Sequence, residues 1–109
     1  MSRRSQLLKG VLEGCILSII KTTPTYGYEL SMRLQEYGLS NVSEGSIYPI
    51  LLRLQKEKLI VGEMKDSDSG PKRKYYQLTE EGKQSLHNFI EQWESIKEPV
   101  ESILNKGRE

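Results

Sequence analysis

The sequence predicts a mainly α-helical fold with one small β-hairpin, and three observations support this prediction. Apolar residues recur at three-and-four spacing from residue 7 to about residue 58, which is typical of amphipathic helices. Two short runs, 59–65 and 72–78, have the apolar and aromatic composition of strands and flank a polar loop. From residue 79 onward, apolar residues repeat every seven positions, as in a helix that packs against another helix.

Length and composition set further bounds. The chain has 109 residues, enough for one compact core, and its single cysteine, Cys15, excludes an intrachain disulfide and the paired-cysteine zinc motifs. Cys15 is either a buried, inert thiol or a redox sensor, and its place in an apolar stripe favours the first. No stretch approaches the about 20 apolar residues of a membrane span, so we expect a cytoplasmic protein.

The first two helices are predicted from their apolar faces and their ends. The first covers residues 7–20 and stops before Pro24, because proline disfavours helical geometry in the residue before it. A second helix is expected to begin after Thr25, with the Thr25 hydroxyl as N-cap. It would bury a face that runs from Tyr26 to Tyr37 and end at Gly38.

A third helix and a hairpin follow. Ser43 is the expected N-cap, and the helix is expected to reach about Lys58, continuing through Pro49 because the apolar stripe continues on both sides of it. That stripe consists of Ile47, Ile50, Leu51 and Leu54. Residues 59–65 and 72–78 then form the two strands of a hairpin around a polar loop.

A long last helix begins after Thr79, and its heptad seam needs another helix as a partner. The seam packs either on its own domain or on a second copy of the chain. We favour a homodimer, because a domain this small already uses three helices and the hairpin for its core. Residues 1–78 would form the winged helix-turn-helix domain and residues 79–109 the dimerisation helix, with a kink expected near residues 95–98 because of Pro99. The expected dimerisation residues are Leu86, Phe89, Ile90, Trp93, Ile96, Val100 and Ile103.

Three helices followed by a hairpin is the order of a winged helix-turn-helix, whose third helix enters the DNA major groove while the hairpin wing lies along the backbone. The sequence offers small polar groups at the start of the third helix, and cations on its exposed face and on the wing. The wing cations form either a solvated face or a phosphate contact, and Tyr48 is either a phosphate donor or a core residue. The candidate DNA-binding residues are Ser43, Ser46, Tyr48, Pro49, Arg53, Lys56, Lys65, Lys72, Arg73 and Lys74.

Three short strings in the sequence are more specific than the order of the elements. They are Tyr26-Gly27-Tyr28-Glu29-Leu30, Ser46-Ile47-Tyr48-Pro49-Ile50-Leu51, and Arg73-Lys74-Tyr75-Tyr76-Gln77-Leu78-Thr79 followed by Gly82. Together these strings resemble the PadR family of bacterial transcriptional regulators. The resemblance covers roughly residues 5–97. It implies a winged helix-turn-helix homodimer that represses a promoter through a pseudo-palindromic operator on double-stranded DNA and is often released by a small molecule.

The single C-terminal helix resembles that of the multidrug-responsive members, in which a tryptophan from each subunit lines an apolar cavity and stacks on planar aromatic ligands. The resemblance implies a ligand site that includes Trp93, Phe89 and Cys15. Packing in the dimer core is the alternative role of Trp93. The chain departs from the family pattern at Pro99, just beyond Trp93, and at Glu44, where many members have proline.

Two other classes of function compete with a DNA-binding regulator. An enzyme has little support, because the single histidine, His87, has no nucleophile motif near it and no metal-ligand spacing. We therefore expect no catalytic residue, no metal and no cofactor. The stronger alternative is a winged helix that makes protein-protein contacts without DNA binding, and the net charge of only +1 leaves it open.

Overall fold

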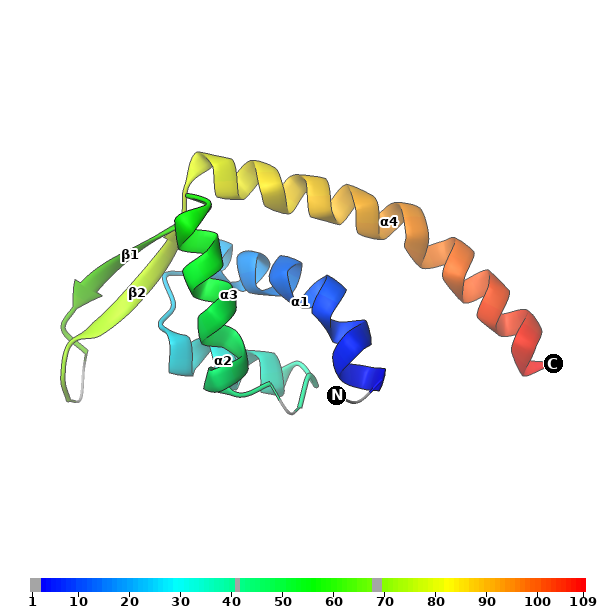
Figure 1. Ribbon diagram of the computed structural model, residues 1–109, viewed down its shortest axis with the longest axis horizontal. Coiled ribbons are helices and arrows are strands. Elements are labelled where there is room, and N and C mark those ends of the chain that lie inside the picture. Colours follow the sequence, from blue (N-terminus) through cyan, green and yellow to red (C-terminus); the bar gives the residue numbers. More distant parts are fainter. Residues whose placement is uncertain (1–2, 41, 68–69) are drawn as a thin grey trace.

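The computed structural model describes residues 3–40, 42–67 and 70–109. Within these residues the chain forms four helices and two strands, in the order of a winged helix-turn-helix followed by one long helix (Figure 1). This is the predicted fold. The elements are α1 (Arg3–Thr22), α2 (Gly27–Glu36), α3 (Glu44–Lys56), β1 (Ile60–Lys65), β2 (Arg73–Leu78) and α4 (Glu80–Arg108).

The core lies where α1, α2, α3, the root of the hairpin and the start of α4 meet. Figure 1 shows α1 between α4 on one side and α2 on the other, with α3 running across them. Helices α1, α2 and α3 each bury an apolar face in this core, because burial of such a face is what stabilises an amphipathic helix of this length, and α4 contributes Leu86. The core side chains are Leu12, Ile16, Leu17, Ile20, Leu30, Leu34, Val42, Ile47, Leu51, Leu54, Ile60, Tyr76 and Leu86.

The prediction that Thr25 caps α2 is wrong. The N-cap position is Tyr26, whose side chain makes no cap bond, and the Thr25 hydroxyl donates instead to the carbonyl of Thr23 at 2.7 Å. The Thr25 backbone pairs with Tyr76 of β2, with its carbonyl accepting from the Tyr76 amide at 3.0 Å. Thr25 is therefore buried against the hairpin, and a contact across 51 residues of chain replaces the local cap.

The buried face of α2 is also shorter than predicted. Leu30 and Leu34 are buried, whereas Tyr37 is 83% exposed. The helix ends at Glu36, and Gly38, with a φ of 104°, turns the chain away immediately afterwards. Tyr37 therefore lies at the helix end and projects into solvent.

The ends of α3 are well defined. The Ser43 hydroxyl accepts from the Ser46 amide at 3.3 Å, so the predicted N-cap is confirmed, and the helix continues through Pro49. At the other end Lys58 has a φ of 64°, and the Leu59 amide donates to the Leu54 carbonyl at 2.9 Å. This closing turn directs the chain into β1.

The hairpin and α4 are joined by a tight connection at Thr79. The strands pair antiparallel, from Ile60 opposite Leu78 to Lys65 opposite Arg73. The Thr79 hydroxyl accepts from the Gly82 amide at 3.0 Å, which confirms the predicted cap of α4. The same hydroxyl donates to the Lys58 carbonyl at 2.7 Å, so it also holds the start of α4 against the end of α3.

The first half of α4 packs on the body of the protein, and the second half extends beyond it (Figure 1). Leu86, which the heptad placed in a seam between two copies, is only 3% exposed within its own chain. Its surface is covered by the core, so this part of the seam is intramolecular, contrary to the prediction. The helix is continuous through Pro99 and changes direction in its orange segment in Figure 1.

Candidate nucleic-acid interface

The face of α3 that points away from the core carries most of the predicted DNA-binding residues of the recognition helix. Ile47, Leu51 and Leu54 turn inward and are buried. Ile50 is partly buried beside them, and most of the other positions of the helix are exposed to solvent. The structure therefore presents on one exposed surface Ser43, Gly45, Ser46, Tyr48, Pro49, Leu52, Arg53 and Lys56.

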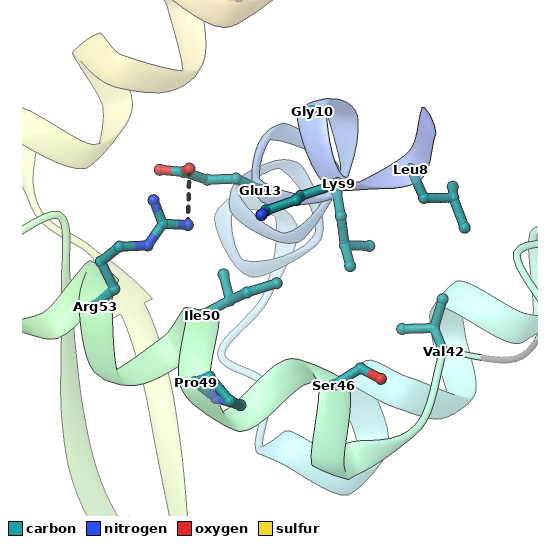
Figure 2. Close-up of a pocket in the computed structure, with 10 residues that line it drawn as sticks. Leu8, Lys9, Gly10, Glu13, Val42, Ser46, Pro49, Ile50 and Arg53 are labelled. Atoms are coloured by element: carbon teal, nitrogen blue, oxygen red, sulfur yellow. Dashed lines mark hydrogen bonds and ion pairs between the residues drawn. The ribbon is translucent and has the colours of Figure 1, made fainter. Parts of the chain in front are cut away.

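An ion pair between α3 and α1 borders this surface. Arg53 donates from Nη2 to Glu13 Oε2 at 3.1 Å, and Figure 2 shows the two side chains reaching toward each other across the gap between the helices. Beside the pair lies an open hollow of about 790 Å³ between the first half of α1 and α3. Ser46 and Pro49 line it from α3, opposite Lys9 and Gly10 of α1 (Figure 2).

Tyr48 is 45% exposed, so it is not a core residue, and its role as a phosphate donor stays a prediction. Its ring lies against Gly27 at the start of α2, where a Cβ atom would approach the Tyr48 hydroxyl to 2.9 Å. Its hydroxyl is at the surface and donates to Glu44 Oε2 at 3.3 Å. Burial, followed by the nearby Glu44 carboxylate, raises the pKa of Tyr48, so this hydroxyl remains protonated and able to donate a hydrogen bond.

The wing cations fall on two faces of the hairpin. Lys74 faces α3, and its Nζ donates to Gln55 Oε1 at 3.5 Å. On the other face the Arg73 guanidinium lies 5.0 Å from the centre of the Tyr26 ring, and its Nε is enclosed without a hydrogen-bond partner among the described residues. Arg73 and Lys74 thus brace the wing against the start of α2 and against α3, although Lys74 is exposed. Lys72 is exposed as well.

Lys65 lies directly opposite Arg73 in the hairpin register. Two cations in such a pair repel each other, which destabilises the hairpin unless other groups compensate. Aromatic rings provide part of that compensation: Lys65 Nζ is 6.0 Å from the centre of the Tyr75 ring, and Tyr75 meets Tyr26 edge to face at 5.2 Å. On this face of the wing, the cations Lys65 and Arg73 therefore lie beside the aromatic rings of Tyr75 and Tyr26.

From Ile90 onward, α4 exposes the remaining predicted dimerisation residues. Trp93 is 41% and Ile96 52% exposed, and the stripe continues to the end of the helix. The large apolar residues exposed along it are Ile90, Trp93, Ile96, Val100, Ile103 and Leu104. Phe89 differs from them, because it is half-buried and its ring lies against Gly14 of α1.

The three predicted ligand-binding residues lie in one place. Cys15 of α1, with Phe89 and Trp93 of α4, lines an open and largely apolar hollow of about 400 Å³ between these two helices. Burial raises the pKa of the Cys15 thiol, which keeps it in the less reactive protonated form. The hollow opens on the same side as the exposed stripe of α4, since both include Ile90 and Trp93.

Sequence reasoning missed three residues at this interface. Glu13 and Gln55 contact predicted cations from other elements, and no local pattern indicates such long-range pairs. Leu52 was the third: it lies outside the predicted apolar stripe and was not among the candidate DNA-binding residues. Its spacing was the available signal: five residues after Ile47 and two before Leu54, it falls on the side of the helix away from the buried face.

None of the helices in the described ranges is long and apolar enough to span a membrane. No group of three or more histidine, cysteine, aspartate or glutamate side chains gathers there in a way that could hold a metal ion.

The sequence is similar to a known protein family and to individual proteins. Residues 16–88 match the family described as Transcriptional regulator PadR-like family. An uncharacterised protein of Lysinibacillus sphaericus is 32% identical over 103 residues, 93% of this chain and 94% of that protein. Transcriptional regulator YqjI of Escherichia coli is 35% identical over 95 residues, and the match spans 85% of this chain but 44% of YqjI.

Solved structures agree with these sequence matches. A crystal structure of a PadR-like transcriptional regulator from Bacillus cereus is 56% identical, with a TM-score of 0.85 over 91% of this chain and 96% of that one. A Streptococcus transcriptional regulator is 46% identical, with a TM-score of 0.83 over 90% of this chain and 96% of that one.

Proposed function

Because the chain belongs to the PadR family of transcriptional regulators, and is thus a DNA-binding regulator with a winged-helix fold, we propose that it is a repressor that binds a pseudo-palindromic operator as a homodimer. The observation that carries this proposal is the combination of two surfaces on one chain. One is the exposed face of α3 beside the cationic wing, and the other is the exposed apolar stripe of α4.

The first surface suits a DNA duplex. At the N-terminus of α3, Ser43 and Ser46 offer hydroxyls, and the first backbone amides of a helix favour an anion such as a phosphate. Arg53 and Lys56 would extend the contact along the groove. Lys72 on the wing would bind backbone phosphates, which adds affinity without sequence preference.

The second surface suits another copy of the same helix. The stripe lies where α4 leaves its own body, so the chain itself does not cover it. Pairing two such helices around a two-fold axis would bury both stripes and link two recognition helices. Half-sites about 34 Å apart, one turn of DNA, are what two linked winged helices require.

A ligand response would use the hollow between α1 and α4. In a homodimer the exposed Trp93 of each copy would lie near the two-fold axis, and the partner would close the open side of the hollow. A planar aromatic ligand could then stack on the indole. It would release DNA only if it bound two arrangements of the dimer with different affinities.

Salt dependence of binding to nonspecific duplex separates a DNA-binding role from the alternative of a protein-protein module. We expect retention on heparin and duplex binding that weakens steeply as salt rises, since phosphate contacts release counterions. Lys106→Ala, which removes an exposed cation at the end of α4, serves as control and is expected to leave binding unchanged. Absence of duplex binding at low salt would favour the protein-protein module.

A further inference from the structure

A leucine occupies the middle of the exposed face of α3. Leu52 is 66% exposed, although its neighbour Leu51 is completely buried. It lies one helical turn after Tyr48 and one turn before Lys56, both of which are also exposed. Leu52 therefore lies in the middle of the candidate recognition face. We expect its apolar side chain to contact an apolar group of the ligand, which the polar residues around it would not bind.

The surroundings of Leu52 limit what that contact can be. Its neighbours along the face are a hydroxyl donor, Tyr48, and two cations, Arg53 and Lys56, which suit phosphates and the polar edges of bases. A leucine side chain can form no hydrogen bond and attracts no phosphate. Among the groups that base pairs present in the major groove, the apolar one is the C5-methyl group of thymine.

We propose that Leu52 reads a thymine in each half-site of the operator by packing against its C5-methyl group. The proposal rests on the proposed function, in which α3 lies in the major groove. It gives Leu52 a role distinct from those of the wing and of Arg53. The wing cations add affinity for any duplex, whereas Leu52 selects sequence.

The expected size of the effect follows from the size of the group. Loss of the contact with one methyl group weakens binding about fourfold. Two copies of Leu52, one per half-site, would therefore give about 16-fold when both contacts are lost and the two sites act independently.

Replacing thymine by deoxyuridine tests this contact directly. A duplex would first be selected from a random pool with the full-length protein, and each thymine in turn would then be replaced by uracil in both half-sites. Uracil pairs like thymine and keeps its polar groups and charge, but it lacks the methyl group. We expect a loss of about 16-fold at one position and little change at the others.

The Leu52→Ala variant completes the test. We expect it to bind the selected duplex about 16-fold more weakly than the natural protein, and to be indifferent to uracil at the sensitive position. Tyr37→Ala is the matched control, because Tyr37 is a large, exposed side chain at the end of α2 and does not belong to the α3 face. It is expected to retain the full response to uracil.

The outcomes separate this inference from the proposed function. The role of Leu52 is overturned if uracil leaves binding unaffected at every position. It is also overturned if the Leu52→Ala variant responds to uracil as the natural protein does. Either result leaves DNA binding in place. If no duplex is enriched from the pool, the proposed function itself fails and the role of Leu52 fails with it.

Discussion

Arg53 on α3 and Glu13 on α1 are joined by an ion pair of 3.1 Å that spans 40 residues of sequence. Both side chains are partly exposed, so the pair contributes at most about 1 kcal/mol. Arg53 is therefore not a freely moving cation on the candidate DNA surface. A phosphate that binds it has to compete with the Glu13 carboxylate.

Removing the charge of Glu13 tests this competition. We expect Glu13→Gln to bind any duplex up to about fivefold more tightly, because Arg53 is released and a negative charge near the DNA is lost. Fluorescence anisotropy with a labelled duplex measures the change. The double variant Glu13→Gln/Arg53→Ala is the control and is expected to lose most of this gain. Weaker binding by Glu13→Gln alone would instead mean that Glu13 holds Arg53 in the position that DNA requires.

The wing and the recognition helix are expected to respond differently to substitution. Lys72→Ala would weaken binding to all duplexes alike and reduce the salt slope by about 2 per dimer, one for each lost phosphate contact. Lys72 is a cleaner probe than Arg73, which also braces the wing against Tyr26. Ser46→Ala would change sequence preference, as measured by competition between related duplexes. A shift of preference in Lys72→Ala with an unchanged salt slope would reverse the two roles.

The sequence predicted the elements well because their signals are local. Ser43 and Thr79 cap the helices that were expected to follow them, and their hydroxyls accept from amides three residues away. The predictions from sequence failed where a contact with a distant residue overrides a local preference. Thr25 pairs with β2 rather than capping α2, and Leu86 completes the chain's own core rather than a seam between copies.

At the candidate site, too, local features could be predicted from the sequence and contacts with distant residues could not. The exposure of Arg53 follows from helical spacing, but its partner Glu13 depends on how α1 crosses α3, and no pattern within either helix specifies that packing. The orientation of Leu52 could have been deduced from spacing alone. The candidate DNA-binding residues taken from the sequence nevertheless did not include it.

Dimerisation through α4 is best tested at residues that its own chain leaves exposed. We expect Ile96→Glu/Ile103→Glu to be monomeric, because it places like charges in the apolar stripe, and to lose specific operator binding. Phe89 is unsuitable for this purpose, since it packs on Gly14 within the chain. Ser95→Glu/Ser102→Glu adds the same charges outside the stripe and is expected to remain dimeric. Sedimentation velocity distinguishes the two, and a dimeric Ile96→Glu/Ile103→Glu variant would place the interface elsewhere.

Trp93 is the only tryptophan, so fluorescence reports on the candidate ligand site alone. We expect planar aromatic cations or phenolic acids that release the operator to quench this fluorescence, since they would stack on the indole. In Trp93→Phe, release by the same compound is expected to require a higher concentration. A compound that releases the operator without changing the fluorescence would place the sensor elsewhere.

Lys58 provides a test of local stability. Its φ of 64° places a residue with a Cβ in the left-handed region at the end of α3. We expect Lys58→Gly to raise the free energy of unfolding by up to about 1 kcal/mol, because glycine adopts this conformation without steric cost. Lys58→Ala removes the same charge, keeps the Cβ and is expected to bring no gain. Urea unfolding at a fixed protein concentration measures both, and equal values for the two variants would contradict the account of this turn.

Selection of duplexes from a random pool tests the central claim, that two copies of the chain bind one operator through paired recognition helices. Full-length protein would be incubated with the pool at moderate salt, and the enriched duplexes would be sequenced. We predict an inverted repeat whose half-sites are centred about 34 Å apart, one turn of B-DNA. Enrichment of a single unrepeated site, or of no sequence at all, would contradict it.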